Sequence, residues 1–319
     1  MRTIIFGPWV GEFSYEVQWW IPEIRQISSE SNCKTIVVGY PGREALYRDF
    51  IDEYISMPPE ILKHCTNPNC WAQRDNVTKA LYLPRQVIEF YNNVCSRYEN
   101  VTKHLPHAEL IERRFNENPY GLYKNINHYN EAAQPIIDLL LSNFKFDNTV
   151  CIVPKLRKRD EVNIDHETWP VNIWESIVNT LTNKNLNVIS FLFKVNGTNP
   201  GTYDLSHLSS KYNDCFKQID LNCDYSLDIQ IGLLKNTFCS IYGSTGAAIL
   251  PIICNTKMIT YQVKESGWRL NFEWQQRLTN NHKYISIKDK YPIDKFKDIS
   301  ITEINNDINE YIEKLKISL

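Results

Sequence analysis

The sequence lacks an excess of charge of either sign, and it lacks long apolar runs. Its 319 residues carry 35 Lys and Arg against 37 Asp and Glu, which gives a net charge of −2. This balance gives no reason to expect nucleic acid or an anionic membrane as an electrostatic partner. No apolar stretch approaches the length of a transmembrane helix, and the run at 3–6 is too short for a secretion signal. We therefore expect a cytoplasmic protein without a transmembrane segment.

A disulfide framework and a standard zinc motif are also missing. The nine cysteines are an odd number, and Cys151, Cys239 and Cys254 lie in apolar runs. This pattern favours buried reduced thiols over disulfides. His64, Cys65 and Cys70 offer three metal-ligand types, but their spacing matches no standard zinc site. We interpret that segment as a loop with incidental thiols.

The chain instead contains a repeated alternation of apolar strands and helices. The first half predicts strands at 3–6 and 34–39 and helices at 14–28, 41–50, 84–98 and 131–143. The second half predicts strands at 149–153, 187–193, 238–242 and 257–261 and helices at 169–183, 224–236 and 303–316. Pro22 predicts a kink or a start within the first helix. This alternation predicts an α/β protein whose two halves each contain a parallel sheet.

A turn of small residues follows the predicted strand at 238–242. It reads Gly243-Ser244-Thr245-Gly246, and Ala247 begins the first turns of a helix. Small residues at a strand-to-helix turn let an anion approach the backbone, and the N–H groups of a helix N-terminus attract it. The alternative interpretation is a tight turn with a Ser or Thr cap, which needs no ligand.

A basic loop follows the predicted strand at 149–153. Its cations are Lys155, Arg157, Lys158 and Arg159. Because open α/β sheets bind ligands at the carboxyl ends of their strands, this loop is a candidate anion site. The alternative is a solvated run of charge, which is the usual role of such runs.

The segment at 150–262 resembles the donor domain of GT-B glycosyltransferases, and most nearly the ADP-heptose:lipopolysaccharide heptosyltransferases. The resemblance rests on the basic loop, on Trp169-Pro170 with Trp174, and on the turn that leads to Leu250 and Pro251. It implies two Rossmann-like α/β domains facing each other across a cleft. Residues 1–146 would form the acceptor-side domain, 147–302 the nucleotide-sugar domain, and 303–319 a terminal helix able to pack back on the first domain.

In that family the two loops hold the diphosphate of the nucleotide-sugar donor. The resemblance therefore implies a set of donor-binding residues: Lys155, Arg157, Arg159, Gly243, Ser244, Thr245, Gly246 and Ala247. The sequence contains no Asp-x-Asp, the carboxylate pair that usually holds a divalent cation in the other large glycosyltransferase fold. Protein cations and helix dipoles would then have to neutralise the diphosphate, so we expect neither a metal nor another cofactor.

The N-terminal stretch resembles the start of the same family, where a Gly and an acid follow the first strand. Here they are Gly11 and Glu12, and the resemblance implies that Glu12 is the catalytic base. Glu16, about one helical turn further on, is the rival candidate, and Glu12 could instead simply complement a helix N-terminus. Gly11, Trp9 and Tyr15 are the candidates for binding the acceptor or sugar, with Trp9 and Tyr15 able to stack on a sugar ring. Trp20 lies on the apolar face and is assigned to the core.

These features predict a metal-independent glycosyltransferase of glycan biosynthesis. It would move a hexosyl, pentosyl or heptosyl group from a nucleotide-sugar donor to a hydroxyl of a glycan, glycoprotein or glycolipid acceptor. Two alternatives stay open: a non-catalytic sugar- or nucleotide-binding protein of the same fold, and a sugar-nucleotide epimerase. An epimerase would need several His and carboxylates facing one cleft. The chain has only seven His, which counts against this alternative.

Overall fold

The chain folds into two compact units, residues 1–128 and 129–319, in a computed structural model. The structure describes residues 2–11, 13–65, 83–107, 129–142, 144, 146–156, 168–193, 201–223, 225–243, 246–262, 282–286 and 300–317. Within these residues, no helix combines the length and apolarity needed to cross a bilayer.

The first unit is built on a four-stranded parallel sheet with the order β3-β2-β1-β4. The strands are β1 (Thr3–Phe6), β2 (Lys34–Gly39), β3 (Glu53–Ser56) and β4 (Val101–His104). The central strand β1 is fully buried, which explains why it reads as an apolar run. Because β1 pairs with β2 on one side and with β4 on the other, the strand order reverses between β1 and β4.

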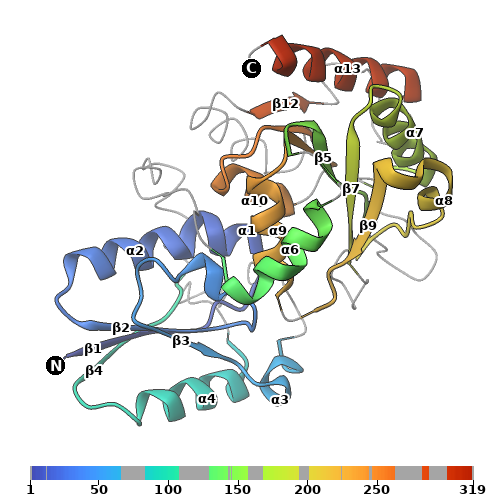
Figure 1. The fold of residues 1–319 in the computed structure, drawn as a ribbon. Coiled ribbons are helices and arrows are strands. Elements are labelled where there is room, and N and C mark those ends of the chain that lie inside the picture. Colours follow the sequence, from blue (N-terminus) through green and yellow to red (C-terminus); the bar gives the residue numbers. More distant parts are fainter. Residues whose placement is uncertain are drawn as a thin grey trace. The chain divides into compact units, whose positions relative to one another are not determined.

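Helices cover both faces of this sheet, with α2 and α4 on opposite sides (Figure 1). The helical segments are α1 (Phe13–Tyr15), a π-helical turn (Glu16–Trp20), α2 (Ile21–Glu30), a 3₁₀ turn (Glu44–Leu46), α3 (Pro59–Leu62) and α4 (Arg85–Cys95). Pro22 lies in the first turn of α2, so the helix starts there, where a proline is tolerated.

The helix expected at 41–50 is only a 3₁₀ turn with further turns after it. Two side chains tie this segment to its neighbours. Asp49 accepts two hydrogen bonds from Arg25 of α2, at 2.5 and 2.9 Å, and Tyr47 donates one to Glu16 at 2.6 Å. These tertiary contacts outweigh the local helical tendency of the segment.

The second unit is built on a six-stranded parallel sheet with the order β12-β11-β10-β5-β7-β9. Its strands are β5 (Thr149–Val153), β7 (Asn187–Leu192), β9 (Phe216–Asp220), β10 (Cys239–Tyr242), β11 (Met258–Gln262) and β12 (His282–Ser286). A separate antiparallel pair joins β6 (Lys155–Leu156), which follows β5 in the sequence, to β8 (Gly201–Thr202), which follows β7. Here the strand order reverses between β5 and β10.

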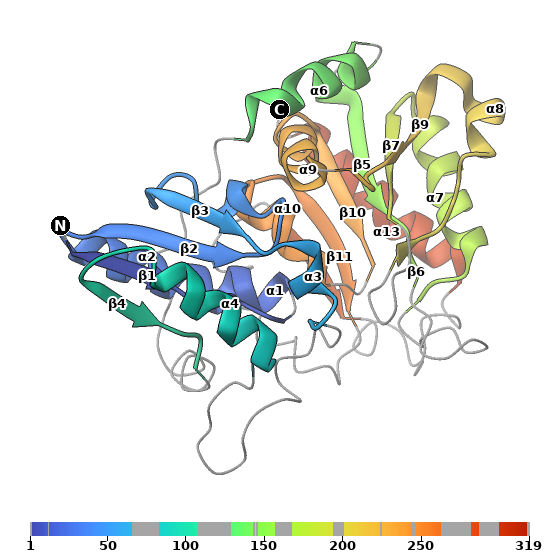
Figure 2. The ribbon, with the colours of Figure 1, turned by 90° about the horizontal axis from the view of Figure 1, so that it is seen from below.

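Helices cover both faces of the second sheet as well, with α7 and α13 on one side and α6 and α9 on the other (Figures 1 and 2). The helices are α6 (Gln134–Leu141), α7 (Val171–Thr182), α8 (Leu208–Tyr212), α9 (Ser226–Lys235), α10 (Ile249–Ile253) and α13 (Ile301–Ile317). The described residues of this unit also form 3₁₀ turns at Glu131–Ala133, Phe146–Asn148, Asn213–Cys215 and Gly246–Ala248.

The division between the units differs from the expected one at 146/147. The helix α6, which the sequence analysis assigned to the first domain, packs on α9 of the second unit, where Ile137 lies against Gly232. The terminal helix α13 contacts α7 of the second unit. The sequence had left open that this helix packs on the first domain. Its Ile304 and Ile308 belong to the same buried cluster as Ile173, so α13 completes the core of the second unit.

The three cysteines of the apolar runs are buried and reduced, as the sequence predicted. Cys151, Cys239 and Cys254 are buried and form no disulfide. Burial raises the pKa of Cys151 and of Cys254 to about 12, so both thiols stay protonated at neutral pH.

Candidate functional site

Each sheet has one point at which the strand order reverses, and open α/β sheets bind ligands at the carboxyl ends of the strands there. In the first unit this switch point lies between β1 and β4, and in the second it lies between β5 and β10. The loop after β1 carries the Gly11-Glu12 motif. The basic loop and the small-residue turn follow β5 and β10. Three of the segments that the sequence analysis selected therefore follow the strands that form the two switch points.

In the second unit the basic loop and the small-residue turn leave adjacent strands. Tyr242 of β10 pairs with Val153 of β5, so Gly243 and Lys155 follow paired residues of neighbouring parallel strands. The two segments that the resemblance assigned to the diphosphate therefore follow adjacent strands. Lys155 is only 5% exposed and pairs with Thr202 through β6 and β8. Arg157, Arg159, Ser244 and Thr245 lie outside the described residues.

The turn after Gly243 is built from backbone and small side chains. Gly246 to Ala248 form a 3₁₀ turn, and α10 then runs for only five residues, so its dipole is smaller than a longer helix would provide. Ala248 stands at the N-cap and makes no side-chain capping bond, so no Ser or Thr cap starts α10. A Cβ on Gly243 would meet the ring of Trp174 at 3.5 Å, an ordinary contact.

In the first unit the chain after β1 turns through Gly11 into a π-helical turn, a rare conformation that is frequent at functional sites. Glu16 of this turn is 1% exposed and forms an ion pair with Arg43, while the hydroxyl of Tyr47 donates to its other oxygen. Burial lowers the pKa of Arg43 and raises that of Tyr47.

The guanidinium of Arg43 also lies over the ring of Tyr40, at 4.6 Å. Both oxygens of Glu16 thus accept buried hydrogen bonds from the protein itself. These contacts favour Glu16 as the residue that holds the π-helical turn, rather than as a base. Glu12, the first candidate for the base, lies outside the described residues.

The tryptophans between β1 and α2 are packed inside the unit. Trp9 is 1% exposed and its ring stacks on that of Trp20, with centroids 6.4 Å apart. The choice of Trp9 as a platform for a sugar ring is therefore wrong, because both rings are in the core. The assignment of Trp20 to the core is confirmed. The side chain of Tyr15 lies outside the described part of the chain.

The carboxyl edge of the first sheet also gathers a cluster that the sequence analysis missed. Glu23 of α2 lies 2.7 Å from Nε2 of His104, the last residue of β4, and 3.3 Å from Nε2 of His107. Burial tends to raise the pKa of Glu23, but hydrogen bonds from the two imidazoles overcome it and lower the pKa to about 2. The only signal in the sequence is His-x-x-His, since Glu23 is 81 residues from His104.

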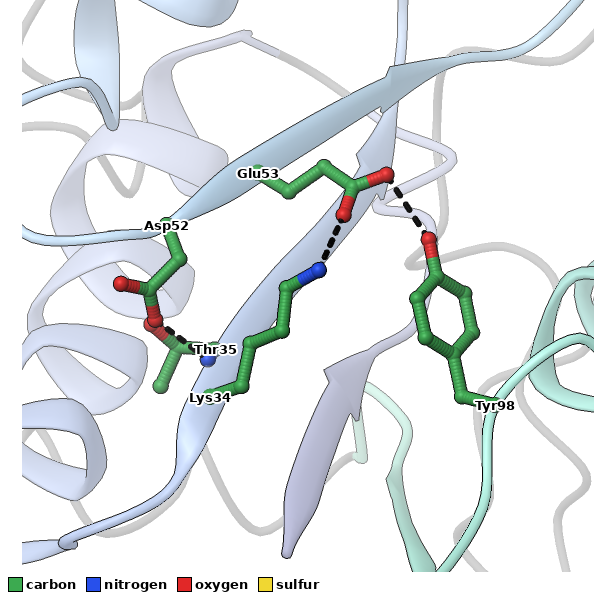
Figure 3. A network of polar contacts seen from close by, with 5 residues as sticks. All are labelled: Lys34, Thr35, Asp52, Glu53 and Tyr98. Carbon is green, nitrogen blue, oxygen red and sulfur yellow. Dashed lines mark hydrogen bonds and ion pairs between the residues drawn. The ribbon is translucent and has the colours of Figure 1, made fainter. Parts of the chain in front are cut away.

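The opposite, amino edge of the same sheet carries a different polar network (Figure 3). Lys34 and Tyr98 both donate to Glu53, each at 2.7 Å, and the backbone N–H and hydroxyl of Thr35 donate to Asp52 at 2.7 and 2.9 Å. These bonds join the starts of β2 and β3 to the chain after α4. They stabilise the sheet at the edge where parallel sheets do not bind ligands.

The fold and its two switch points define a class: α/β proteins of two units with parallel sheets. Solved structures with 10–12% identity share this fold. A family 9 glycosyltransferase from Veillonella parvula has a TM-score of 0.61 at 10% identity over 100% of this chain and 98% of that one. ADP-heptose LPS heptosyltransferase II from E. coli has a TM-score of 0.56 at 12% identity, over 99% and 100%.

A third similar structure is the E. coli heptosyltransferase WaaC with ADP-2-deoxy-2-fluoro heptose. Its TM-score is 0.55 at 10% identity, and the match covers 97% of this chain and 99% of that one. No protein-family model and no curated protein sequence matches the chain. These structures confirm the α/β fold with parallel sheets that the resemblance implied, while the cleft between the two domains stays a prediction. A fold alone does not define an activity.

Proposed function

We propose that the chain is a glycosyltransferase that moves a sugar from a nucleotide-diphosphate donor to an acceptor hydroxyl. The observation that supports this most is that Lys155 and the turn at Gly243 follow two adjacent, paired strands, β5 and β10, at the switch point of the second unit. The WaaC structures of the same fold contain ADP or ADP-2-deoxy-2-fluoro heptose. An ADP-sugar is therefore the first donor to test. The acceptor is a glycan, glycoprotein or glycolipid, in cytoplasmic glycan biosynthesis.

The reaction needs charge stabilisation on the leaving diphosphate. The bond between the anomeric carbon and the diphosphate oxygen breaks as the acceptor oxygen bonds to that carbon. Lys155 is buried, where its charge acts through a lower dielectric than at an exposed site, and Arg157 and Arg159 add further cations. The backbone of the turn at 243–247 holds the diphosphate beside them. In this proposal protein cations stabilise the diphosphate, without a metal ion at the donor.

The acceptor hydroxyl must lose its proton as it attacks. We assign that proton to Glu12, which directly follows Gly11 after the central strand of the first unit. A positioned base contributes about 10²–10⁴-fold to a rate. Replacing Glu12 with Gln removes the base but keeps the shape of the side chain. We expect Glu12→Gln to lower turnover by about that factor while leaving donor affinity unchanged.

A matched pair of lysine variants tests the donor site. Lys155 lies at the carboxyl edge of the second sheet, whereas Lys184, paired with Glu313 at 2.7 Å, precedes β7 at the amino edge. Loss of a hydrogen bond to a charged group costs about 1.5–3 kcal/mol, so Lys155→Ala should weaken donor binding about 10- to 100-fold. Lys184→Ala should leave it unchanged.

Binding is measured by the shift of the melting temperature with ADP, UDP and GDP. A ligand at 100 times its Kd stabilises the folded chain by about 2.7 kcal/mol. Transfer is then measured with the matching nucleotide-sugars and a panel of glycan acceptors. Nucleotide binding without transfer would indicate a binding protein, and a changed sugar on an intact nucleotide would indicate an epimerase. No shift with any nucleotide would contradict the proposal.

A further inference from the structure

Among the residues that the structure describes, one group of three potential metal ligands gathers around a common point. The group consists of Glu23, His104 and His107, whose three ligand atoms all lie within 4.8 Å of one another. We propose that these residues form a binding site for a divalent first-row transition metal ion, with Zn²⁺ as the probe ion. The site belongs to the first unit, and the inference does not depend on the proposed donor site in the second.

The distances are close to those of a metal-bound set. Ligands of a tetrahedral ion at about 2.0–2.1 Å are about 3.3 Å apart from one another. Nε2 of His107 is already 3.3 Å from the carboxylate oxygen of Glu23. Nε2 of His104 is 2.7 Å from the same oxygen, at hydrogen-bond distance. Metal binding therefore needs the contact of His104 to widen by about 0.6 Å. The ligand nitrogens of the two imidazoles, which lie within 4.8 Å of each other, must also take a separation of about 3.3 Å, and each must bind the ion without a proton.

The donor set suits such an ion. Imidazole nitrogen favours zinc, copper, iron and nickel over magnesium or calcium, and a carboxylate completes the set. Two His and one Glu from the protein leave a fourth position open, as in zinc sites that bind water or an oxygen ligand.

The ligands are held in place by the fold. The ring of His104 lies parallel to that of Trp20, with centroids 5.6 Å apart, and meets the edge of Phe6 at 5.7 Å. The carbonyl of His104 accepts a hydrogen bond from the N–H of Gly7 at 2.7 Å, which ties the end of β4 to the end of β1. These contacts orient one ligand before any ion binds, and preorganisation of this kind strengthens metal sites.

The solvent exposure and the location of the three side chains also suit a metal-binding site. The three side chains are 13%, 27% and 34% exposed, so an ion can reach them from solvent. They stand at the β1/β4 switch point, the edge where parallel sheets bind ligands. The pair of His207 and Glu175 has a similar 2.8 Å contact, but it is more exposed and lies outside the group of three ligands. It therefore provides a matched control.

The experiment is calorimetric titration of Zn²⁺ into the full chain after treatment with a chelator, with the absorption spectrum of Co²⁺ as a second measurement. We expect one equivalent to bind with a Kd in the micromolar range or below. His107→Ala and the isosteric Glu23→Gln should each raise the Kd of this one Zn²⁺ ion at least 10-fold, and the absorption bands of bound Co²⁺ should be lost. His207→Ala should leave both measurements unchanged.

A further control addresses the other potential ligands of the chain. Cys65→Ser removes a thiol from the His64-Cys65 segment, and it should leave the one equivalent in place. Circular dichroism establishes that each variant is folded before it is titrated. The inference is overturned if the wild-type chain binds no equivalent, or if Cys65→Ser removes the equivalent and His107→Ala does not. In that case the cluster is a hydrogen-bonded triad that fixes α2 to β4.

Discussion

The two switch points occupy the same topological place in their sheets, yet they are built from different groups. At β1/β4, Glu23, His104 and His107 are in contact, and the ring of His104 lies against those of Phe6 and Trp20. At β5/β10, small residues follow one strand and a lysine follows the other. A set of carboxylate and imidazole groups suits a cation, whereas a lysine beside open backbone suits an anion. The topology fixes where a ligand binds, and the loop residues decide its charge.

The largest expected effect tests whether the first unit depends on the ion pair that holds its π-helical turn. Arg43→Met leaves Glu16 buried at 1% exposure without its cation, and breaking such a pair costs about 3–5 kcal/mol. Urea unfolding should show a loss of this size. Arg48→Met removes an exposed cation that lies 3.9 Å from Glu44, and it should cost less than about 1 kcal/mol. Equal losses in the two variants would show that the buried pair has no special role.

An intermediate effect compares one glycine from each unit. A Cβ on Gly39, at the end of β2, would lie 2.3 Å from the hydroxyl of Tyr54, which donates to the carbonyl of Tyr40. Overpacking of this kind costs about 1–3 kcal/mol, so Gly39→Ala should lower the urea midpoint. Gly243→Ala makes only an ordinary contact with Trp174 and should change stability by less than about 0.5 kcal/mol.

The same two variants are then compared in donor binding. A methyl group at residue 243 obstructs the approach of a diphosphate to the backbone, so Gly243→Ala should weaken nucleotide binding despite its normal stability. Gly39→Ala should bind the nucleotide normally at a temperature where it is folded. The reverse result would remove the turn from the proposed donor site.

The smallest expected effect lies at the amino edge of the first sheet. The hydrogen bond from Lys34 lowers the pKa of Glu53 below its usual value, so the pair stabilises the fold above the unfolded-state pKa of Glu53. That stability is lost as the pH falls through the folded-state pKa. Because the two side chains are 31% and 36% exposed, solvent screening limits the effect to about 0.2–1 kcal/mol.

The urea midpoints of the wild type and of Glu53→Gln measure the contribution of the Lys34–Glu53 pair to the free energy of unfolding. The two proteins should differ at pH 7, and the difference should shrink at pH 3. Glu99→Gln, which changes an exposed glutamate after Tyr98, should show no such dependence. A difference that persists unchanged at pH 3 would mean that the charge of Glu53 is not its cause.

The strands that the sequence predicted correctly are those inside the sheets. β1, β2, β5, β7, β10 and β11 are all interior strands, and they read as apolar runs because they are buried on both faces. The strands β3, β4, β9 and β12 were missed, and every one of them lies at the edge of a sheet. These edge strands carry polar side chains, as in Val-Thr-Lys-His of β4, so no apolar run marks them.

The same reason limits what could be predicted of the sites. That Lys155 and Gly243 each follow a buried strand was predictable, because the apolar pattern identifies both strands. That these two strands are neighbours is known only from the sheet order. His104 ends an edge strand that the pattern does not show, and its partner Glu23 is 81 residues away. The burial of Trp9 was not predictable either, because only the folded loop reveals that its ring stacks on Trp20.

The place of α13 in the core of the second unit has a consequence for how the protein is made. Its residues Ile304, Ile308 and Ile312 cover the same cluster as Ile173 and Trp174 of α7. A ribosome adds about 5–20 residues each second, so α7 waits roughly 6–25 s after its own synthesis for this helix to emerge. During that interval the nascent chain exposes a broad apolar surface, which makes it a substrate for chaperones that act during translation.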